Sequence, residues 1–302
     1  MTRLRAWLEL TRGANLPTVW SNVLVGWLLA VAFGAKLDAG SFPQLGWALL
    51  GASLLYTAGM FLNDAADAAW DAAHRRERPV PSGRVSARSA ALAGGALLLV
   101  GAEACHLASP AAGVAGLVLA SLVLAYTRWH KSRPAAAPWL MGACRALLPL
   151  VGFLANPPDL APPAGLSLLL AHALALGLFT SGISLLARHE ATGGEPGRLA
   201  RALPLLATLP VPAVLLTQGA TPWVALIWAC GLMLLPAWSR RRHADIGDRV
   251  AFRIAALCLV DYLLWLAVRA RFEPSDPLAM GGLMLLLFFG TALALRRLLP
   301  ST

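Results

Sequence analysis

The sequence predicts an all-α protein that crosses a membrane many times, as a bundle of nine to ten helices around a central cavity. Two observations lead to this fold class. Apolar residues make up 58% of the 302 residues and charged residues only 13%, which is too apolar for an ordinary soluble domain. Lys and Arg also gather in alternate loops instead of spreading evenly. We therefore expect one integral-membrane domain over residues 1–302.

Ten apolar runs are long enough to cross about 30 Å of hydrocarbon as helices. Turn-like segments rich in Pro and Asn separate several of them. The runs cover residues 16–34, 45–62, 87–107, 111–127, 136–155, 164–187, 200–217, 221–238, 251–270 and 278–297.

Basic residues lie before the first run and after each even-numbered run, whereas the other loops hold little beyond Lys36, Arg269 and Arg271. The positive-inside rule then places the N-terminus and the even-numbered loops in the cytoplasm, and we expect a bacterial inner membrane. This asymmetry accounts for the net charge of +10. Since no nucleic-acid-binding motif accompanies the charge, the expected partners are membrane lipid and small molecules, with no nucleic acid.

A polar stripe follows the second run. Asn63, Asp67 and Asp71 are spaced four residues apart, so an α-helix presents them on one face. Oxygen ligands of this kind suit Mg²⁺, which keeps part of its coordination shell for water and substrate phosphates. Asp64 lies beside the stripe, and the segment from Arg78 to Ser86 follows it.

The run from Asn63 to Asp71, followed by Arg78-Pro79-Val80-Pro81-Ser82-Gly83-Arg84-Val85-Ser86, resembles the first signature of the UbiA superfamily of membrane prenyltransferases. Further similarity lies in Asn15-Leu16-Pro17, in Tyr126-Thr127 and in Lys131, so the resemblance covers most of the chain. It implies the UbiA-like fold, with nine helices around a cavity open to lipid. It also implies Mg²⁺-dependent transfer of a prenyl group from an isoprenyl diphosphate to a small polar or aromatic acceptor.

The resemblance implies roles for individual residues. The expected catalytic residues are Asn63, Asp67 and Asp71. The expected metal ligands are these three with Asp64 and Glu190. The residues expected to bind substrate are Arg78, Tyr126, Lys131, Arg145, Arg188 and His189.

The chain departs from the family pattern after the sixth run, where a second acidic motif is expected. The segment there reads Arg188-His189-Glu190, with no aspartate, so one Mg²⁺ site is favoured over two. Arg188 and His189 can instead hold phosphate directly, His189 can act as a base, or both can belong to a solvated helix end. This segment and Met141–Arg145 also resemble a branch called EboC-like.

Several polar residues fall inside the apolar runs. An ionised Arg145 in the fifth run costs at least about 2.5 kcal/mol unless it meets an anion or water. Its expected partner is a phosphate or, alternatively, Asp261 or Glu103. His172 is expected to be a hydrogen-bonded core residue, because no second ligand lies beside it at helical spacing.

Two other functions remain open. The degenerate second motif allows a UbiA-fold transferase that uses a polyprenyl phosphate acceptor and a phosphorylated sugar donor. It also allows a non-catalytic membrane carrier that has kept the fold. The intact stripe at Asn63, Asp67 and Asp71 argues against the carrier, which has little use for three aligned oxygen ligands.

Overall fold

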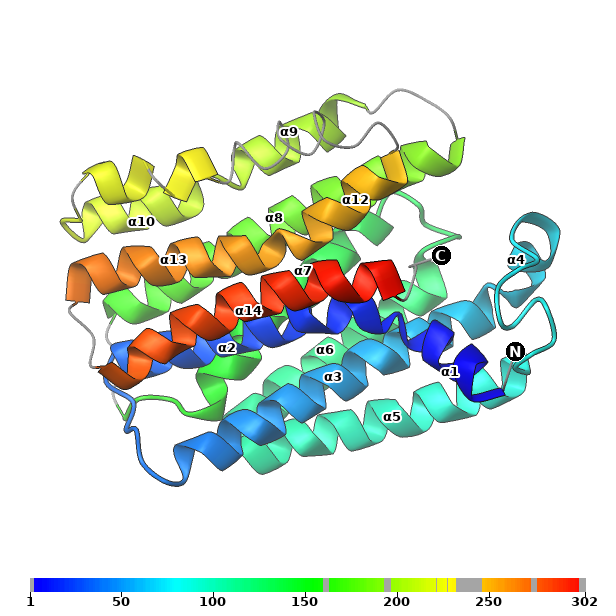
Figure 1. Ribbon diagram of the computed structural model, residues 1–302, viewed down its shortest axis with the longest axis horizontal. Coiled ribbons are helices and arrows are strands. Elements are labelled where there is room, and N and C mark those ends of the chain that lie inside the picture. The colour runs from blue at the N-terminus through cyan, green and yellow to red at the C-terminus, as the bar shows by residue number, and fades with distance from the viewer. Residues whose placement is uncertain are drawn as a thin grey trace.

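The computed structural model describes residues 3–159, 163–192, 197–220, 222–226, 228–231, 246–272 and 276–298. Within these ranges it contains helices and no strand (Figure 1). The helices are α1 (Arg3–Thr11), η1 (Gly13–Asn15), α2 (Leu16–Ala32), α3 (Ser41–Ala66), α4 (Ala68–His74), α5 (Ala87–Ala108), α6 (Pro110–Trp129), α7 (Ala137–Ala155), α8 (Pro163–Thr192), α9 (Arg198–Leu206), α10 (Pro210–Thr217), α12 (Ile246–Ala255), α13 (Leu257–Phe272) and α14 (Asp276–Leu298).

Seven helical segments in the described part of the chain are long and apolar enough to cross a membrane, so the prediction of nine to ten is too high by this measure. The last three predicted runs account for the difference. The described part of run 221–238 contains only a short apolar helix, Pro222–Gly231. Run 251–270 is divided between α12 and α13, and the apolar part of α14 is also short. The all-α membrane bundle itself is confirmed.

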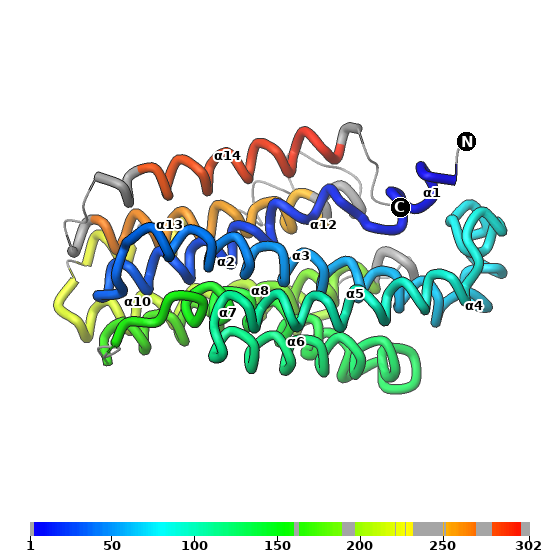
Figure 2. Tube along the Cα trace, turned by 90° about the horizontal axis from the view of Figure 1, so that it is seen from below, coloured from blue at the N-terminus to red at the C-terminus, as the bar shows by residue number. Residues whose placement is uncertain are grey.

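Helix α2 lies at the centre of the bundle. Thirteen of its seventeen residues are buried. One side packs with α3 and α7, and another packs with α13 and α14. Figure 2 shows α2 between α14 on one face and α6 and α7 on the other. Because α2 is apolar on almost all of its faces, other helices have to cover it on every side.

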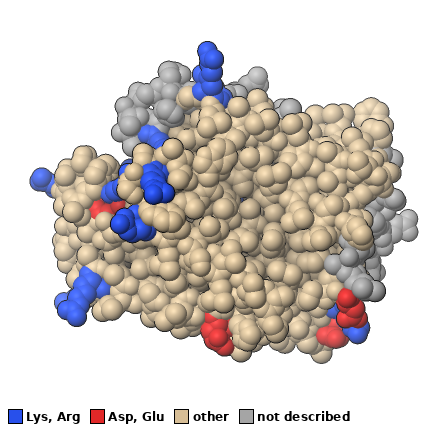
Figure 3. Space-filling view, turned by 180° about the vertical axis from the view of Figure 1, so that it is seen from behind, with Lys and Arg blue, Asp and Glu red and all other residues tan. Residues whose placement is uncertain are grey.

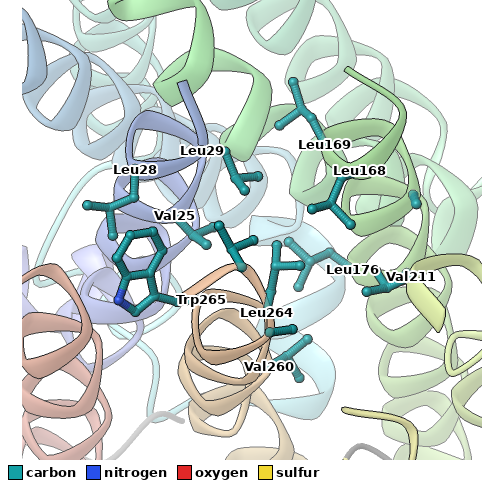
Figure 4. Packing of buried hydrophobic residues seen from close by; sticks show 14 of the residues in the cluster. Val25, Leu28, Leu29, Leu168, Leu169, Leu176, Val211, Val260, Leu264 and Trp265 are labelled. Atoms are coloured by element: carbon teal, nitrogen blue, oxygen red, sulfur yellow. The ribbon is translucent and has the colours of Figure 1, made fainter. Parts of the chain in front are cut away.

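The larger of the two main cores lies where α2 meets α8 and α13. Figure 4 shows Val25 and Leu29 of α2 together with Leu168 of α8 and Val260 and Leu264 of α13. A second core joins the other side of α2 to α3, α5, α6 and α7. These two cores place α2 between two groups of helices.

Glycines let α2 and α7 approach until their backbones touch. A Cβ at Gly26 would collide with the Pro149 carbonyl, and one at Gly152 would collide with the Val23 carbonyl. Small residues at helix crossings of this kind are typical of membrane proteins, where close van der Waals packing holds helices together. The contact fixes the register of α2 against α7.

Basic side chains gather at one end of the bundle, which we call the basic end. It carries α1, α4 and the segment 75–86. Figure 3 shows Lys and Arg concentrated at this end, whereas the long flank of the molecule carries few charges. At the opposite end, exposed Lys36 and Asp159 lie 3.5 Å apart. The charge asymmetry predicted from the sequence is therefore visible along the bundle axis.

Candidate active site

A polar cleft of about 370 Å³ opens at the basic end, between the ends of α3, α6, α7 and α8. Asn63, Asp67 and Asp71 contribute to its wall. Its other polar lining residues are Arg12, Arg75, Arg78, Tyr126, His130, Ser184 and Arg188. Four arginines thus line the cleft beside two aspartates, which suits an anionic ligand.

The backbone keeps the acidic stripe aligned across a helix break. Helix α3 ends at Ala66, and α4 begins at Ala68. The Asp67 N–H nevertheless donates to the Asn63 carbonyl and the Asp71 N–H to the Asp67 carbonyl, each at 2.9 Å. These are helical i to i−4 bonds, so the three side chains stay on one side as the four-residue spacing predicts.

Asp64 lies beside the stripe but does not line the cleft. It is buried, with Oδ1 2.7 Å from Arg12 and 3.7 Å from Arg78. Arg78 also donates to Oδ2 of Asp71 at 2.9 Å. Asp64, which the sequence suggested as a metal ligand, contacts two arginines here, and its role as a ligand stays a prediction.

Arg12 reaches Asp64 through an unusual backbone. Its φ of 46° lies in the left-handed region, which is uncommon for a residue with a Cβ. This turn separates α1 from η1 and α2, and the Arg12 carbonyl accepts a hydrogen bond from Asn15 at 3.0 Å. Arg12 is one of the basic residues before the first apolar run, which were interpreted as topology signals alone, because its partner Asp64 lies 52 positions away in the sequence.

Asp67 is held by the residues that follow α6. Lys131 Nζ lies 2.7 Å and His130 Nε2 3.0 Å from Asp67 Oδ1. Burial raises the pKa of Asp67, but hydrogen bonds from His130 and Lys131 outweigh it and hold that pKa below its usual value. The same hydrogen bond raises the pKa of His130 against the opposing effect of burial. His130 was missed in the sequence, although its place beside Lys131 was a signal.

The donor set fits a hard dication such as Mg²⁺. Asn63 Oδ1 and Asp71 Oδ1 are both buried without a hydrogen-bond partner in the described structure. The described residues contain no cluster of three or more His, Cys, Asp and Glu side chains arranged for a metal. Two aspartates and an amide oxygen are nevertheless enough for Mg²⁺, which commonly takes one or two carboxylates and completes its shell with water and substrate phosphates.

An apolar pocket of about 90 Å³ lies inside the bundle, between α2, α3, α6 and α7. Most of its wall is aliphatic, including Leu55, Val123 and Leu148. Tyr126 lines both the cleft and the pocket, so the two spaces meet at its side chain. Arg145 lines the pocket and not the cleft, which separates it from the other predicted phosphate-binding residues.

Comparison with known proteins identifies the family. Residues 19–259 match the UbiA prenyltransferase family. The chain belongs to this family. Digeranylgeranylglyceryl phosphate synthase of Methanopyrus kandleri is 44% identical over 87 residues, which are 29% of this chain and 30% of that protein. Protoheme IX farnesyltransferase of Alkalihalophilus pseudofirmus is 31% identical over 157 residues, half of each chain. The chain thus spans half or less of these relatives.

Solved structures of the UbiA family share the fold. A digeranylgeranylglyceryl phosphate synthase superposes with a TM-score of 0.64 at 17% identity, over 89% of this chain and 98% of that chain. An apo UbiA homologue from Aeropyrum pernix K1 gives 0.59 at 19% identity, over 82% of this chain and 97% of that chain. These similarities establish the UbiA fold, and the EboC-like resemblance stays a prediction.

The segment in which the sequence departs from the expected second acidic motif lies at the end of α8. Arg188 lines the cleft, as does Ser184 one turn earlier. The side chains of His189 and Glu190 lie outside the described residues. Two other expectations concern single residues. His172 is a buried, hydrogen-bonded core residue, 2.9 Å from Asp261, as expected. Arg145 meets Asn22 and not Asp261 directly.

Proposed function

We propose that this UbiA family protein transfers a prenyl group from an isoprenyl diphosphate to a polar or aromatic acceptor. The observation that carries the proposal is that Tyr126 lines both a cleft rich in arginine and an apolar pocket, so the two spaces are neighbours at this residue. An isoprenyl diphosphate has the same division, with an anionic head and an apolar tail. The names of two relatives, a digeranylgeranylglyceryl phosphate synthase and a protoheme IX farnesyltransferase, support this class of reaction.

The basic side chains of the cleft would bind the diphosphate. Arg12, Arg78 and Arg188 line the cleft, and Lys131 reaches it through Asp67. Guanidinium groups bind phosphate oxygens through two parallel hydrogen bonds, whereas an ammonium acts as a point charge. Together they neutralise negative charge that grows on the diphosphate as it leaves.

Mg²⁺ would be held by Asn63, Asp67 and Asp71, and it would supply further positive charge to the leaving diphosphate. Asn63 Oδ1 and Asp71 Oδ1, which have no hydrogen-bond partner in the described structure, would be available as metal ligands. Asp67 would exchange its bonds to His130 and Lys131 for the metal, which frees these cations for phosphate. Asp64 would hold Arg12 and Arg78 in position through its ion pairs with them.

The pocket protects the reacting carbon. The allylic C–O bond breaks with its electron pair going to the diphosphate, a nucleophilic atom of the acceptor bonds to the same carbon, and the acceptor then loses a proton. Aliphatic walls around Leu55, Val123 and Leu148 exclude water that would otherwise capture the carbon. We assign the basic end to the cytoplasmic side of a bacterial inner membrane by the positive-inside rule.

The test measures binding of geranyl S-thiolodiphosphate, an unreactive donor analogue, to the purified full-length protein. We expect binding that requires Mg²⁺ and that weakens at least about 30-fold in Asp71→Asn and in Asp67→Asn, since each loses a charged ligand. Radiolabelled geranyl diphosphate with a panel of phenols, polyols and quinols then measures transfer.

The matched control is Asp159→Asn, which removes an exposed carboxylate at the opposite end of the bundle. We expect this variant to bind the analogue like the wild type. Equal binding by Asp71→Asn and Asp159→Asn would remove the metal and diphosphate assignment. Mass spectrometry of co-purified lipid gives an independent view of the prenyl chain.

A further inference from the structure

We propose that a groove beside α1, at the basic end, binds the phosphate headgroup of an anionic phospholipid whose acyl chains lie along the outer face of α5. The groove has a volume of about 410 Å³, and its lining includes Arg3, Trp7, Arg84, Ser86 and Ser89. Among the described residues, none that lines this groove also lines the diphosphate cleft. The lipid site therefore lies outside the proposed prenyl transfer.

Two segments of the basic end form the groove. Helix α1 supplies Arg3 and Trp7, whereas the loop before α5 and the first turn of α5 supply Arg84, Ser86 and Ser89. Figure 1 shows α1 at the end of the bundle where α5 begins. The walls thus offer two guanidinium groups and two hydroxyl groups, which are the donors that a phosphate accepts from.

Helix α1 is fixed to the bundle by one face, so it can serve as a wall. Ala6 and Leu10 are buried in a small core to which Phe61 and Val85 also belong. The ring centroid of Trp7 lies 5.3 Å from that of Phe61. These contacts hold α1 against the loop that forms the opposite side of the groove.

The charges around the groove leave an excess of positive charge. Glu9 forms ion pairs with Arg84 at 2.7 Å and with Arg5 at 3.6 Å. Arg3 is exposed and forms no ion pair with a described carboxylate. Three arginines thus share one glutamate, with Arg84 held in place and Arg3 open to a ligand. An anion in the groove would balance the remaining charge.

An apolar face of α5 continues from the groove along the bundle. Ser89 lines the groove, and Leu92, Ala96 and Leu99 follow it three, seven and ten residues later, so all four share one helix face. These side chains are exposed, Leu92 at 66% and Leu99 at 73%. Helix α5 packs with α3 and α6 through other residues, such as Gly101 and Cys105. In a membrane this face contacts acyl chains directly below the groove.

Helix α1 places the groove at the depth of the lipid headgroups. Leu4 and Leu8 lie four residues apart on one face of α1 and are 68% and 50% exposed. A helix with an exposed apolar face and neighbouring arginines lies in the membrane interface, with its apolar side chains among the upper acyl carbons. The groove beside α1 is then level with the phosphates of the same leaflet.

This combination fits an anionic phospholipid better than other anions. A soluble phosphate would meet the arginines but would make no use of the apolar face of α5. A zwitterionic lipid has the same chains and phosphate, yet its own cation opposes Arg3 and Arg84. A lipid with net negative charge uses both parts of the site.

The test measures phospholipid binding to the purified full-length protein by native mass spectrometry. Dioleoyl phosphatidylglycerol is the anionic probe, and dioleoyl phosphatidylcholine, with the same chains, is the zwitterionic one. We expect the first phosphatidylglycerol to bind about tenfold more tightly than phosphatidylcholine. Equal affinities for the two lipids would refute the proposal.

Ser89→Glu reverses the charge of the groove without disturbing the helix. Ser86 caps α5 by accepting a hydrogen bond from the Ser89 N–H at 3.0 Å. Glutamate is favoured at this third helical position, because its carboxylate can accept a hydrogen bond from the N–H of the capping residue. We expect the preference for phosphatidylglycerol to disappear in this variant. A preference that survives would contradict a headgroup site in the groove.

Arg3→Gln and Arg5→Gln form a matched pair. Both remove one positive charge from α1, but only Arg3 lines the groove. We expect Arg3→Gln to bind phosphatidylglycerol about fivefold more weakly and Arg5→Gln to change it less than about twofold. Equal losses would mean that the surface attracts anionic lipid without a defined site, which would overturn the proposal.

Glycerophosphoglycerol, the same headgroup without acyl chains, distinguishes a lipid from a soluble anion. At millimolar concentration it should not displace phosphatidylglycerol from the wild type. Displacement would assign the groove to a soluble phosphate compound and would overturn the lipid assignment.

Binding of geranyl S-thiolodiphosphate separates this site from the cleft. It should change less than about threefold in Ser89→Glu and Arg3→Gln, because the two sites share no lining residue in the described structure. Loss of analogue binding in both variants would place the groove in the donor site and overturn the proposal. If the wild type does not bind the analogue, the proposed function fails, and the preference for phosphatidylglycerol still decides the role of the groove.

Discussion

The cleft and the pocket both bury charge, but they balance it differently. In the cleft, Asp71 meets Arg78 at 2.9 Å and Asp67 meets Lys131 at 2.7 Å. In the pocket, Arg145 reaches Asp261 only through Asn22. Arg78 and Asp71 are buried, so parting them requires a new partner for each, as a diphosphate and a metal would supply. The pair in the pocket is relayed through an amide, so the charges are balanced without direct contact.

The largest effect is expected from removing the charge behind the pocket. Asp261→Leu leaves Arg145 without balance and Asn22 without its acceptor, so we expect a loss of about 3–5 kcal/mol in unfolding free energy. Chemical denaturation in detergent micelles measures it. Arg145→Met in the same chain should recover part of the loss. If the unfolding free energy of Asp261→Leu alone lay within about 1 kcal/mol of the wild-type value, the charges of Arg145 and Asp261 would be independent.

The next effect concerns the helix contact that holds the pocket together. Gly152→Val drives a side chain into the Val23 carbonyl and separates α7 from α2, with an expected cost of about 1–3 kcal/mol. Thermal unfolding measures it, with Gly95→Ala as control because a Cβ there meets open space. Equal losses in the two variants would contradict a backbone contact between α7 and α2 at Gly152.

A smaller effect is expected inside the cleft. Lys131 Nζ lies 4.6 Å from the Trp70 ring centroid, an arrangement that orients the ammonium toward Asp67. Trp70→Leu should weaken binding of geranyl S-thiolodiphosphate about two- to fivefold, equivalent to about 0.5–1 kcal/mol. Trp129→Leu removes a similar contact with Arg133 outside the cleft and should leave binding unchanged. Calorimetry distinguishes the two.

The smallest expected effect is a pH dependence confined to the cleft. The pKa of His130 is raised by its hydrogen bond to Asp67, so the folded state binds a proton more tightly than the unfolded state. This stabilisation is complete below the usual histidine pKa and fades as pH rises through the raised value. The melting temperature of the metal-free protein should therefore fall as pH rises through the raised pKa of His130. In His130→Gln, the melting temperature should depend less on pH over the same range.

Asp67 titrates in the opposite direction. Its lowered pKa contributes stability above the usual aspartate pKa, and this contribution is lost as pH falls through the lowered value. Asp67→Asn should remove both this acid limb and the effect of His130, because the two groups form one pair. An unchanged alkaline limb in that variant would show that His130 titrates independently of Asp67.

The sequence predicted the fold and the stripe because both follow from local spacing. Apolar runs report membrane helices directly, and residues four apart share a helix face whatever lies around them. Run 251–270 was predicted as one span, whereas the chain divides it into α12 and α13. Nothing in its hydropathy marks this division.

Contacts between distant segments could not be predicted in the same way. Arg12 with Asp64, and His130 with Asp67, join residues more than fifty positions apart. For Asp64, nothing in the sequence indicated that Arg12 and Arg78 would be its partners. For Arg145 the sequence required a partner, and Asn22 as an intermediate was not among the alternatives.

The central position of α2 has a consequence for biosynthesis. Asn22 precedes its partner Asp261 by 239 positions, so α2 is synthesised well before α13. Until α13 is inserted, a nascent chain carries an Arg145 with no counter-charge behind it and an α2 with one face uncovered. The polar core around α2 is therefore complete only once α13 is in place, and a chain truncated before residue 261 leaves Arg145 and Asn22 without Asp261.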